Sequence, residues 1–155
     1  MSDVKGAATP GAAALRATLV FNLGTLGALA TDRFAARVEA LGLKPKHAGL
    51  LAALDAESAA SQQELATRLG VVPSLIVSLA DQLQALGAVE RVRDPEDRRR
   101  QVLTLTAEGR RLLARCAEAA EAADAELAAG LTAAQRTALG RELRALRAAQ
   151  TPDGR

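Results

Sequence analysis

The segment "DPEDRRRQVLTLT", residues 94–106, restricts the fold more than any other stretch of the chain. Six of its first seven residues are charged, and a run in which apolar and polar residues alternate follows at once. A second short run of this kind, "AVERV" at residues 88–92, precedes the charged residues. Two such runs around a polar connection are typical of a β-hairpin. We therefore predict two short strands joined by an exposed loop over residues 94–100.

Helical spacing of apolar residues dominates on both sides of this hairpin. From Ala12 to Leu41 the spacing predicts one long helix, loosened at Gly24 and Gly27. Its length exceeds what one small core needs, and its apolar residues lie on more than one face. We therefore expect this helix to contact a second copy of the chain.

Three shorter helices are predicted between the long helix and the hairpin. The first covers residues 45–55 and has a proline in its first turn. The second covers residues 61–70, where Ser61 and Glu64 match a capping box and a glycine provides the stop. The third runs from a proline to a glycine over residues 73–87. The middle of the chain thus reads as a helix-turn-helix followed by a two-stranded wing.

Two further helices are predicted after the hairpin. Thr106 is placed to cap a helix that runs to about Ala129, and Gly130 breaks it. Thr132 caps a last helix, which we expect to fray near Pro152. The predicted fold class is therefore mainly α with a small β-hairpin wing.

Charge distribution indicates an anionic partner. The net charge of the 155 residues is only +2, but residues 91–100 hold five arginines against three acids. A local basic patch on a near-neutral body is typical of a protein that binds nucleic acid. Aromatic residues make up 1% of the chain, so the core must be aliphatic.

The composition argues against an enzyme. One histidine and one cysteine cannot form a metal site of the usual His/Cys kind, and there is no glycine-rich phosphate loop. We expect no catalytic residues, no metal and no cofactor. No signal pattern and no long uncharged apolar run is present, which predicts a cytoplasmic protein without a membrane segment.

Three segments resemble the MarR family of bacterial transcription regulators, namely "QQELATRLG", "PSLIVSLADQLQALGAVER" and "DRRRQVLTLTAEGRRLL". The third is the most specific. The family's wing signature combines an Asp-x-Arg loop, a strand that ends in Leu-Thr and a helix that contains glycine. The residues that match it are Asp97, Arg99, Leu105, Thr106 and Gly109. The resemblance extends over roughly residues 15–150. It implies a homodimer that binds a pseudo-palindromic operator on double-stranded DNA, usually as a repressor.

The resemblance also implies a domain organisation. A winged helix-turn-helix domain for DNA binding is expected over residues 43–105. A helical dimerisation region is expected from the N-terminal helix, residues 12–42, and the C-terminal helices, residues 106–150. Residues 1–11 are predicted to be a flexible N-terminus, and residues 151–155 a tail.

The helix of residues 73–86 corresponds to the recognition helix of the family. Its outward, N-terminal residues are predicted to be Ser74, Leu75, Val77 and Ser78. The two serines suit donation to phosphates or base edges, and Leu75 or Val77 suits contact with thymine methyl groups. No lysine or arginine lies in residues 71–90, where family members often carry one.

The wing is expected to supply the positive charge for DNA contact. By resemblance, Arg99 is the arginine that enters the minor groove, and Asp97 is placed to pair with its guanidinium group and hold it. Alternation would place Arg98 and Arg100 on one face of the hairpin and Arg99 on the other. Arg91 and Arg93 are each expected either to contact phosphate or to be simple strand-edge charges.

Family resemblance further implies an effector pocket between the dimerisation helices and the winged domain. Its candidate polar residues are Asn22, Thr25 and His47, although His47 also suits a surface or capping role. With so few aromatic residues the pocket would be aliphatic, which suits a lipophilic ligand or none. Cys116 is interpreted as a small buried residue rather than a redox sensor.

A protein-interaction module is the alternative from another functional class. The recognition-type helix is apolar and has no positive charge, and a winged helix with such a face can bind proteins with little DNA binding. The arginine cluster of the wing argues against this alternative, because it costs more at a protein interface than at a DNA interface.

Overall fold

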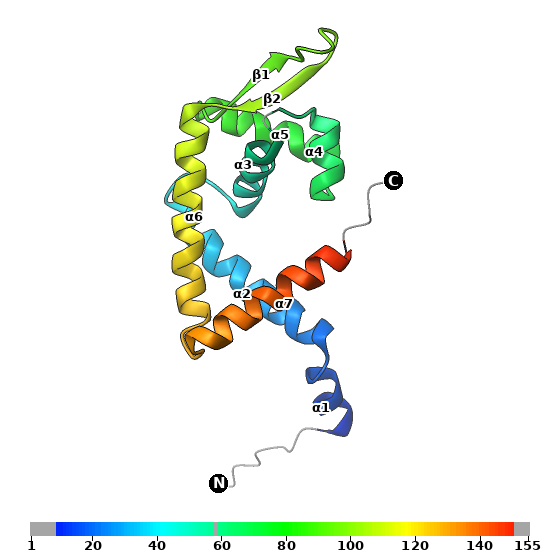
Figure 1. Ribbon diagram of the computed structural model, residues 1–155, viewed down its shortest axis with the longest axis vertical. Coiled ribbons are helices and arrows are strands. Elements are labelled where there is room, and N and C mark those ends of the chain that lie inside the picture. Colours follow the sequence, from blue (N-terminus) through cyan, green and yellow to red (C-terminus); the bar gives the residue numbers. More distant parts are fainter. Residues whose placement is uncertain (1–8, 58, 151–155) are drawn as a thin grey trace, which may run out of the picture.

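The computed structural model describes residues 9–57 and 59–150, and within them the chain forms helices and one small sheet (Figure 1). In chain order the elements are α1 (Pro10–Arg16), α2 (Leu19–Glu39), α3 (Pro45–Glu57), α4 (Gln62–Leu69), α5 (Pro73–Ala85), β1 (Val89–Arg93), β2 (Gln101–Leu105), α6 (Ala107–Leu127) and α7 (Ala133–Gln150). The predicted fold class, mainly α with a hairpin wing, is confirmed.

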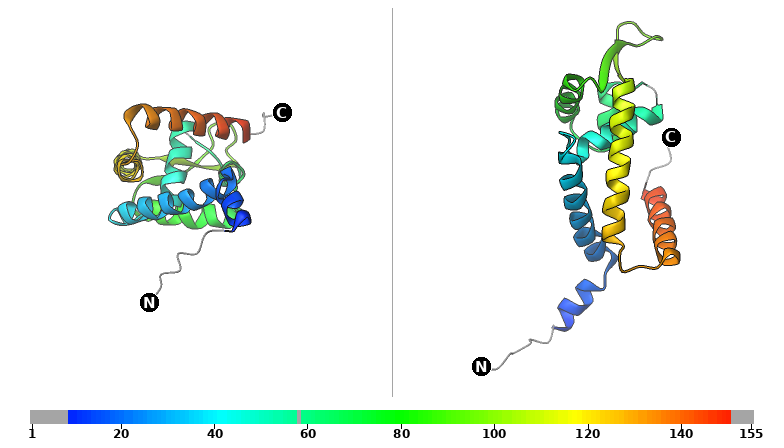
Figure 2. Two further views of the ribbon diagram at one scale, coloured as in Figure 1. Left: turned by 90° about the horizontal axis from the view of Figure 1, so that it is seen from below. Right: turned by 90° about the vertical axis from the view of Figure 1, so that its left-hand side faces the viewer.

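The elements form two parts (Figure 1), which we call the head (α3, α4, α5, β1 and β2) and the stalk (α1, α2, α6 and α7). Figure 1 shows α3, α4, α5 and the hairpin grouped at one end, while α6 runs from this head along the length of the molecule. In Figure 2, α2 and α7 lie on opposite sides of α6. Helix α7 has no buried residue, so most of its surface is open to a partner.

The core of the head is aliphatic, as the composition predicted. The large side chains that are fully buried are Leu50, Leu51, Leu54, Leu65, Ile76, Leu83, Leu103, Val38 and Val89. They come from α2, α3, α4, α5, β1 and β2, so every element of the head contributes to one core. Helix α6 adds Leu112 and Cys116 to it, which attaches the stalk firmly to the head.

The hairpin forms where the alternating runs predicted it. Strands β1 and β2 are antiparallel, and their register runs from Val89 opposite Leu105 to Arg93 opposite Gln101. On the far side of β2, Leu103 exchanges backbone hydrogen bonds with Ala60, at N–O distances of 2.8 and 3.2 Å. This bridge attaches the hairpin to the chain just before α4, so the wing has a fixed direction from the head.

The capping signals before α4 are confirmed in full. The Ser61 hydroxyl oxygen accepts from the Glu64 backbone N–H at 3.2 Å, and a Glu64 carboxylate oxygen accepts from the Ser61 backbone N–H at 2.7 Å. Gly70 ends the helix at a φ of 63°, a left-handed conformation that glycine adopts at little cost. The turn between α4 and α5 is therefore set by local sequence.

The prediction of one long N-terminal helix is wrong. Helices α1 and α2 are separate and meet at a bend of 64°. The break lies at Ala17 and Thr18, whereas Gly24 and Gly27 continue α2. Thr18 causes the break, because its hydroxyl caps α2 by accepting from the Phe21 backbone N–H at 3.2 Å. A threonine at the N-cap stabilises the start of a helix, so α2 begins anew at this point.

The predicted N-terminal boundary also differs from the structure. Helix α1 already begins at Pro10, so residues 10–11 belong to a helix that the sequence predicted to start at Ala12. Residues 1–8 and the predicted tail at 151–155 lie outside the described residues. Within those residues, no single helix is both long and apolar enough to cross a membrane, although α1 and α2 taken together pass that test of length and composition.

Candidate nucleic-acid interface

Helix α5 presents a mixed outer face. Ile76, Leu79, Ala80 and Leu83 are buried in the core, while Ser74, Val77 and Ser78 are exposed at its N-terminal half. The structure thus brings three of the four predicted contact residues to one surface. Leu75, the fourth, is partly buried and packs against the core, so it has less surface to offer a thymine methyl group.

Asp81, the acidic residue on α5, forms an ion pair within the protein. The Arg91 guanidinium group on β1 pairs with Asp81 and also donates to the Gln84 side-chain oxygen. The Arg91 side chain is consequently only 22% exposed. This contact fastens the wing to the end of α5 and neutralises the one carboxylate on this helix that would repel phosphate.

The tip of the wing leaves two arginines available. Arg98 and Arg99 lie in a turn and are exposed, so the strand alternation that would separate them does not apply. Asp97 does organise Arg99, but through the backbone, because a carboxylate oxygen accepts from the Arg99 backbone N–H at 3.0 Å. The predicted ion pair with the guanidinium group is therefore wrong, and among the described residues neither guanidinium group makes a salt bridge.

Arg100 has a different role from its two neighbours. Its guanidinium group donates to Glu64 on α4 at 2.9 Å, and it lies 4.0 Å from Asp94. Hydrogen bonds from Ser61, and then the one from Arg100, lower the pKa of Glu64 to about 2. Arg100 thus holds the loop end of the wing against α4, although its side chain remains 47% exposed.

Arg93 is exposed on β1, opposite Gln101 in the ladder. The predicted wing residues are therefore neighbours in the sequence but make different contacts. Arg98 and Arg99 face outward, whereas Arg100 braces the wing. The sequence did not predict that Arg100 pairs with Glu64. The pattern around Glu64 indicates only a capping residue of α4, and the two residues are 36 positions apart.

The three candidate effector residues do not form one site. The Asn22 amide donates to the Arg16 and Thr18 carbonyl oxygens, and the Thr25 hydroxyl donates to the Phe21 carbonyl oxygen. The Asn22 amide therefore connects the end of α1 with the start of α2, and the Thr25 hydroxyl bonds within α2. His47 is only 2% exposed and lines a cavity of about 530 Å³ beside α2 and α5, which neither of the other two lines.

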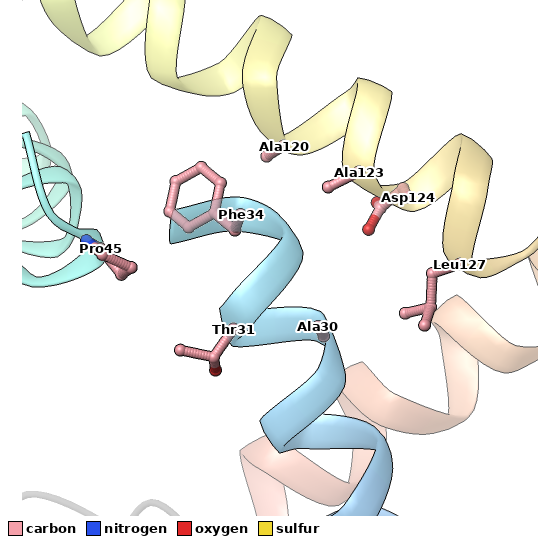
Figure 3. Close-up of a pocket in the computed structure, with 8 residues that line it drawn as sticks. All are labelled: Ala30, Thr31, Phe34, Pro45, Ala120, Ala123, Asp124 and Leu127. Carbon is pink, nitrogen blue, oxygen red and sulfur yellow. The ribbon is translucent and has the colours of Figure 1, made fainter. Parts of the chain in front are cut away.

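A second cavity, of about 250 Å³, lies between α2, the start of α3 and α6. Figure 3 shows Thr31 and Phe34 of α2 on one side and Ala123, Asp124 and Leu127 of α6 on the other. Its wall is apolar except for one hydroxyl and one carboxylate. This cavity lies where the stalk meets the head, which is the position predicted for an effector pocket.

Cys116 lies on the inner face of α6 and is 2% exposed. Burial raises the pKa of its thiol, so little thiolate is available to react with an oxidant. We expect DNA affinity, measured by fluorescence anisotropy, to be the same before and after peroxide treatment, both in the wild type and in Cys116→Ser. A peroxide-driven loss of affinity that disappears in Cys116→Ser would contradict this assignment.

Comparison with known proteins gives a consistent set of relatives. A sequence model of the MarR family matches residues 41–100. The HTH-type transcriptional repressor Rv2887 of Mycobacterium tuberculosis is 33% identical over 130 residues, which cover 84% of this chain and 94% of that protein. A protein named as a transcriptional regulator of the hcr operon of Thauera aromatica is 35% identical over 98 residues, but this chain spans only 59% of its length.

Solved structures of similar proteins include complexes with DNA and with a small molecule. The Rv2887 complex with DNA superposes with a TM-score of 0.74 at 32% identity, covering 84% of this chain and 98% of that one. CouR of Rhodococcus jostii RHA1, bound to p-coumaroyl-CoA, superposes with a TM-score of 0.77 at 26% identity, covering 91% and 97%.

Proposed function

Because this chain belongs to the MarR family of transcription regulators, we propose that it acts as a homodimeric repressor in the bacterial cytoplasm. In this proposal α5 enters the major groove of an operator half-site, and the wing tip reaches the adjacent minor groove. The observation that supports this proposal most directly is that some of the wing arginines form ion pairs within the protein and others do not. Arg91 and Arg100 are tied to the body, while Arg98 and Arg99 extend from a turn whose backbone Asp97 holds.

The experiment that separates this function from a protein-interaction module is binding to a nonspecific duplex at low salt. Two outward arginines per wing should give measurable affinity that falls steeply as salt rises, because binding releases counterions. No binding to any duplex at low salt would favour the protein-interaction module and would overturn the proposal.

Dimerisation is assigned to the exposed apolar faces of the stalk. Large apolar side chains are exposed on α1, α2 and α7, and those on α7 are Leu139, Leu143 and Leu146. The spacing of 4 and then 3 places these leucines on one stripe of the helix. A dimer would bury this stripe and would set two α5 helices about one DNA turn apart.

Leu143→Asp is expected to convert the dimer into monomers, because it places a charge in the centre of this apolar stripe. Sedimentation at micromolar concentration should show twice the 16.0 kDa chain mass for the wild type and the chain mass for the variant. Arg141→Asp is the matched control, since Arg141 is exposed and lies on the opposite side of α7. A wild type that sediments only as a monomer, or a dimeric Leu143→Asp, would refute this interface.

The cavity between α2, α3 and α6 is our proposed effector site. Its alanine, phenylalanine and leucine walls suit a compact lipophilic molecule, and the carboxylate of Asp124 disfavours an anionic one. CouR, a structural neighbour, is bound to p-coumaroyl-CoA, a larger and anionic ligand, so it supports the presence of a ligand site in this fold and not the class of ligand. An occupant would act by favouring one spacing of the two α5 helices over another.

Phenol is a suitable neutral probe of this cavity. We expect it to shift the backbone amide NMR signals of Thr31 and Ala120 in a saturable way. Ala120→Leu should abolish these shifts, because the larger side chain fills the space. Saturable binding that Ala120→Leu leaves unchanged would place the ligand elsewhere.

A further inference from the structure

A chain of hydrogen bonds connects the buried start of α3 with the exposed face of α5. It begins at His47, where the ring nitrogen Nδ1 accepts from the Lys44 backbone N–H at 2.9 Å. The other ring nitrogen, Nε2, lies 3.1 Å from the side-chain oxygen of Gln82. The Gln82 amide nitrogen in turn donates to the Ser78 hydroxyl oxygen at 3.1 Å.

The direction of every hydrogen bond in this series follows from the first one, which joins the Lys44 backbone N–H to His47. A backbone N–H can only donate, so Nδ1 of His47 must be unprotonated. The proton of the neutral ring is then on Nε2, which donates to the Gln82 oxygen. With its oxygen engaged by His47, the Gln82 amide has to present its nitrogen to Ser78.

This arrangement determines what Ser78 can offer to DNA. A serine hydroxyl is ordinarily both a donor and an acceptor, so it distinguishes base edges poorly. Here the oxygen of Ser78 accepts from Gln82, and in the part of the chain that the structure describes its hydroxyl proton has no acceptor. The hydroxyl proton of Ser78 is thus left for a partner outside the protein.

We propose that Gln82 is a specificity-determining residue that acts through Ser78 and makes it a donor toward the DNA. The base read by Ser78 would be one that presents an acceptor in the major groove, such as N7 or O6 of guanine, N7 of adenine or O4 of thymine. The amino groups of cytosine and adenine would be disfavoured at that point, because only one lone pair of the Ser78 oxygen remains to accept from them. This inference rests on the proposed function, in which α5 enters the major groove.

His47 is suited to anchor this chain because it is held neutral. Burial lowers the pKa of its imidazole, the nearby Lys44 charge lowers it further, and the hydrogen bond to Gln82 works in the opposite direction. A protonated ring would place two N–H groups against each other at Lys44. Gln82 itself is exposed and does not contribute to the core, so it can be replaced without unfolding the head.

The test is selection of binding sites from a randomised duplex library by the wild type and by variants. Gln82→Leu and Ser78→Ala should both lose base preference at the same single position of each half-site and keep it elsewhere. Ser78→Ala should also bind the wild-type duplex about fivefold more weakly, as expected for one net hydrogen bond, whereas Gln82→Leu keeps a hydroxyl that can still donate and should bind this duplex nearly unchanged. The double variant should lose no more affinity than Ser78→Ala alone, because Gln82 acts only through Ser78.

Gln63→Leu is the matched control, since it makes the same substitution at an exposed glutamine of α4 that lies outside the chain of hydrogen bonds. A more direct test is Gln82→Glu, whose carboxylate can only accept. Ser78 would then have to donate to Glu and turn its lone pairs outward. The preferred base at that position should change to one that presents an amino group.

The outcomes separate this inference from the function on which it rests. A wild type that enriches no sequence overturns both. A wild type that enriches an operator, together with Gln82 variants that enrich the same base at every position, overturns the role of Gln82 alone. A double variant that binds more weakly than Ser78→Ala alone would also contradict it.

Discussion

Replacing Gly109 with alanine is expected to lower the free energy of unfolding by about 3 kcal/mol, at the upper end of the usual cost of overpacking. A Cβ atom at this position would lie 2.0 Å from the Ala88 carbonyl oxygen and 2.8 Å from a methyl group of Leu105. The first of these neighbours is backbone and cannot rotate away. Relief would require the first turn of α6 to move off the turn before β1.

Three hydrogen bonds hold the start of α6 against the turn before β1. The Thr106 backbone N–H donates to the Ala88 carbonyl oxygen at 3.1 Å, and the Thr106 hydroxyl donates to the Gly87 carbonyl oxygen at 2.6 Å. The same hydroxyl oxygen accepts from the Gly109 backbone N–H at 3.0 Å. Displacing α6 would strain all three bonds and change the direction of the wing.

Urea unfolding followed by circular dichroism measures the effect of Gly109→Ala. Gly49→Ala is the matched control, since Gly49 is also helical and a Cβ there would meet no atom within 4 Å. It should be neutral or stabilise by about 0.5–1 kcal/mol, the usual gain from removing glycine from a helix. Equal effects of the two substitutions would show that close packing at Gly109 is not the cause.

Replacing Arg99 with alanine is expected to weaken operator binding by about tenfold, which corresponds to roughly 1.4 kcal/mol. Its side chain is exposed at the wing tip, and Asp97 holds only its backbone, so the guanidinium group is free to enter a narrow minor groove. The plot of log affinity against log salt should become shallower by about one phosphate equivalent per protomer.

Fluorescence anisotropy over a salt series measures both quantities. Arg141→Ala is the control, because it removes an exposed arginine that pairs with Glu142 on α7, away from the wing. It should change neither the affinity nor the slope. An unchanged affinity and salt dependence in Arg99→Ala would remove Arg99 from the interface.

Local signals in the sequence predicted most of the fold. The Ser61–Glu64 capping box, the glycine after α4 and the threonine before α6 each operate within a few residues of the chain, so they can be read directly. Thr18 was a cap of the same kind, but it lies inside a run with helical apolar spacing. That spacing suggested continuity, and only the structure shows that the side-chain hydrogen bonds start a new helix there.

Contacts between distant segments could not be read in the same way. Arg100 and Glu64 are 36 residues apart, and His47 and Gln82 are 35 residues apart. Which arginine of three consecutive ones turns inward depends on where the bridge between Ala60 and Leu103 directs the hairpin. The sequence therefore predicted a basic wing but not which of its arginines stay available.

The most direct test of the whole account is the dependence of binding on half-site spacing. A selected operator with an inverted repeat should bind one dimer, and inserting about half a helical turn between the half-sites should abolish specific binding. Inserting a full turn moves the second half-site back to the same face but out of reach, so affinity should remain low. Binding that is indifferent to spacing would contradict a dimer that reads two half-sites with paired α5 helices.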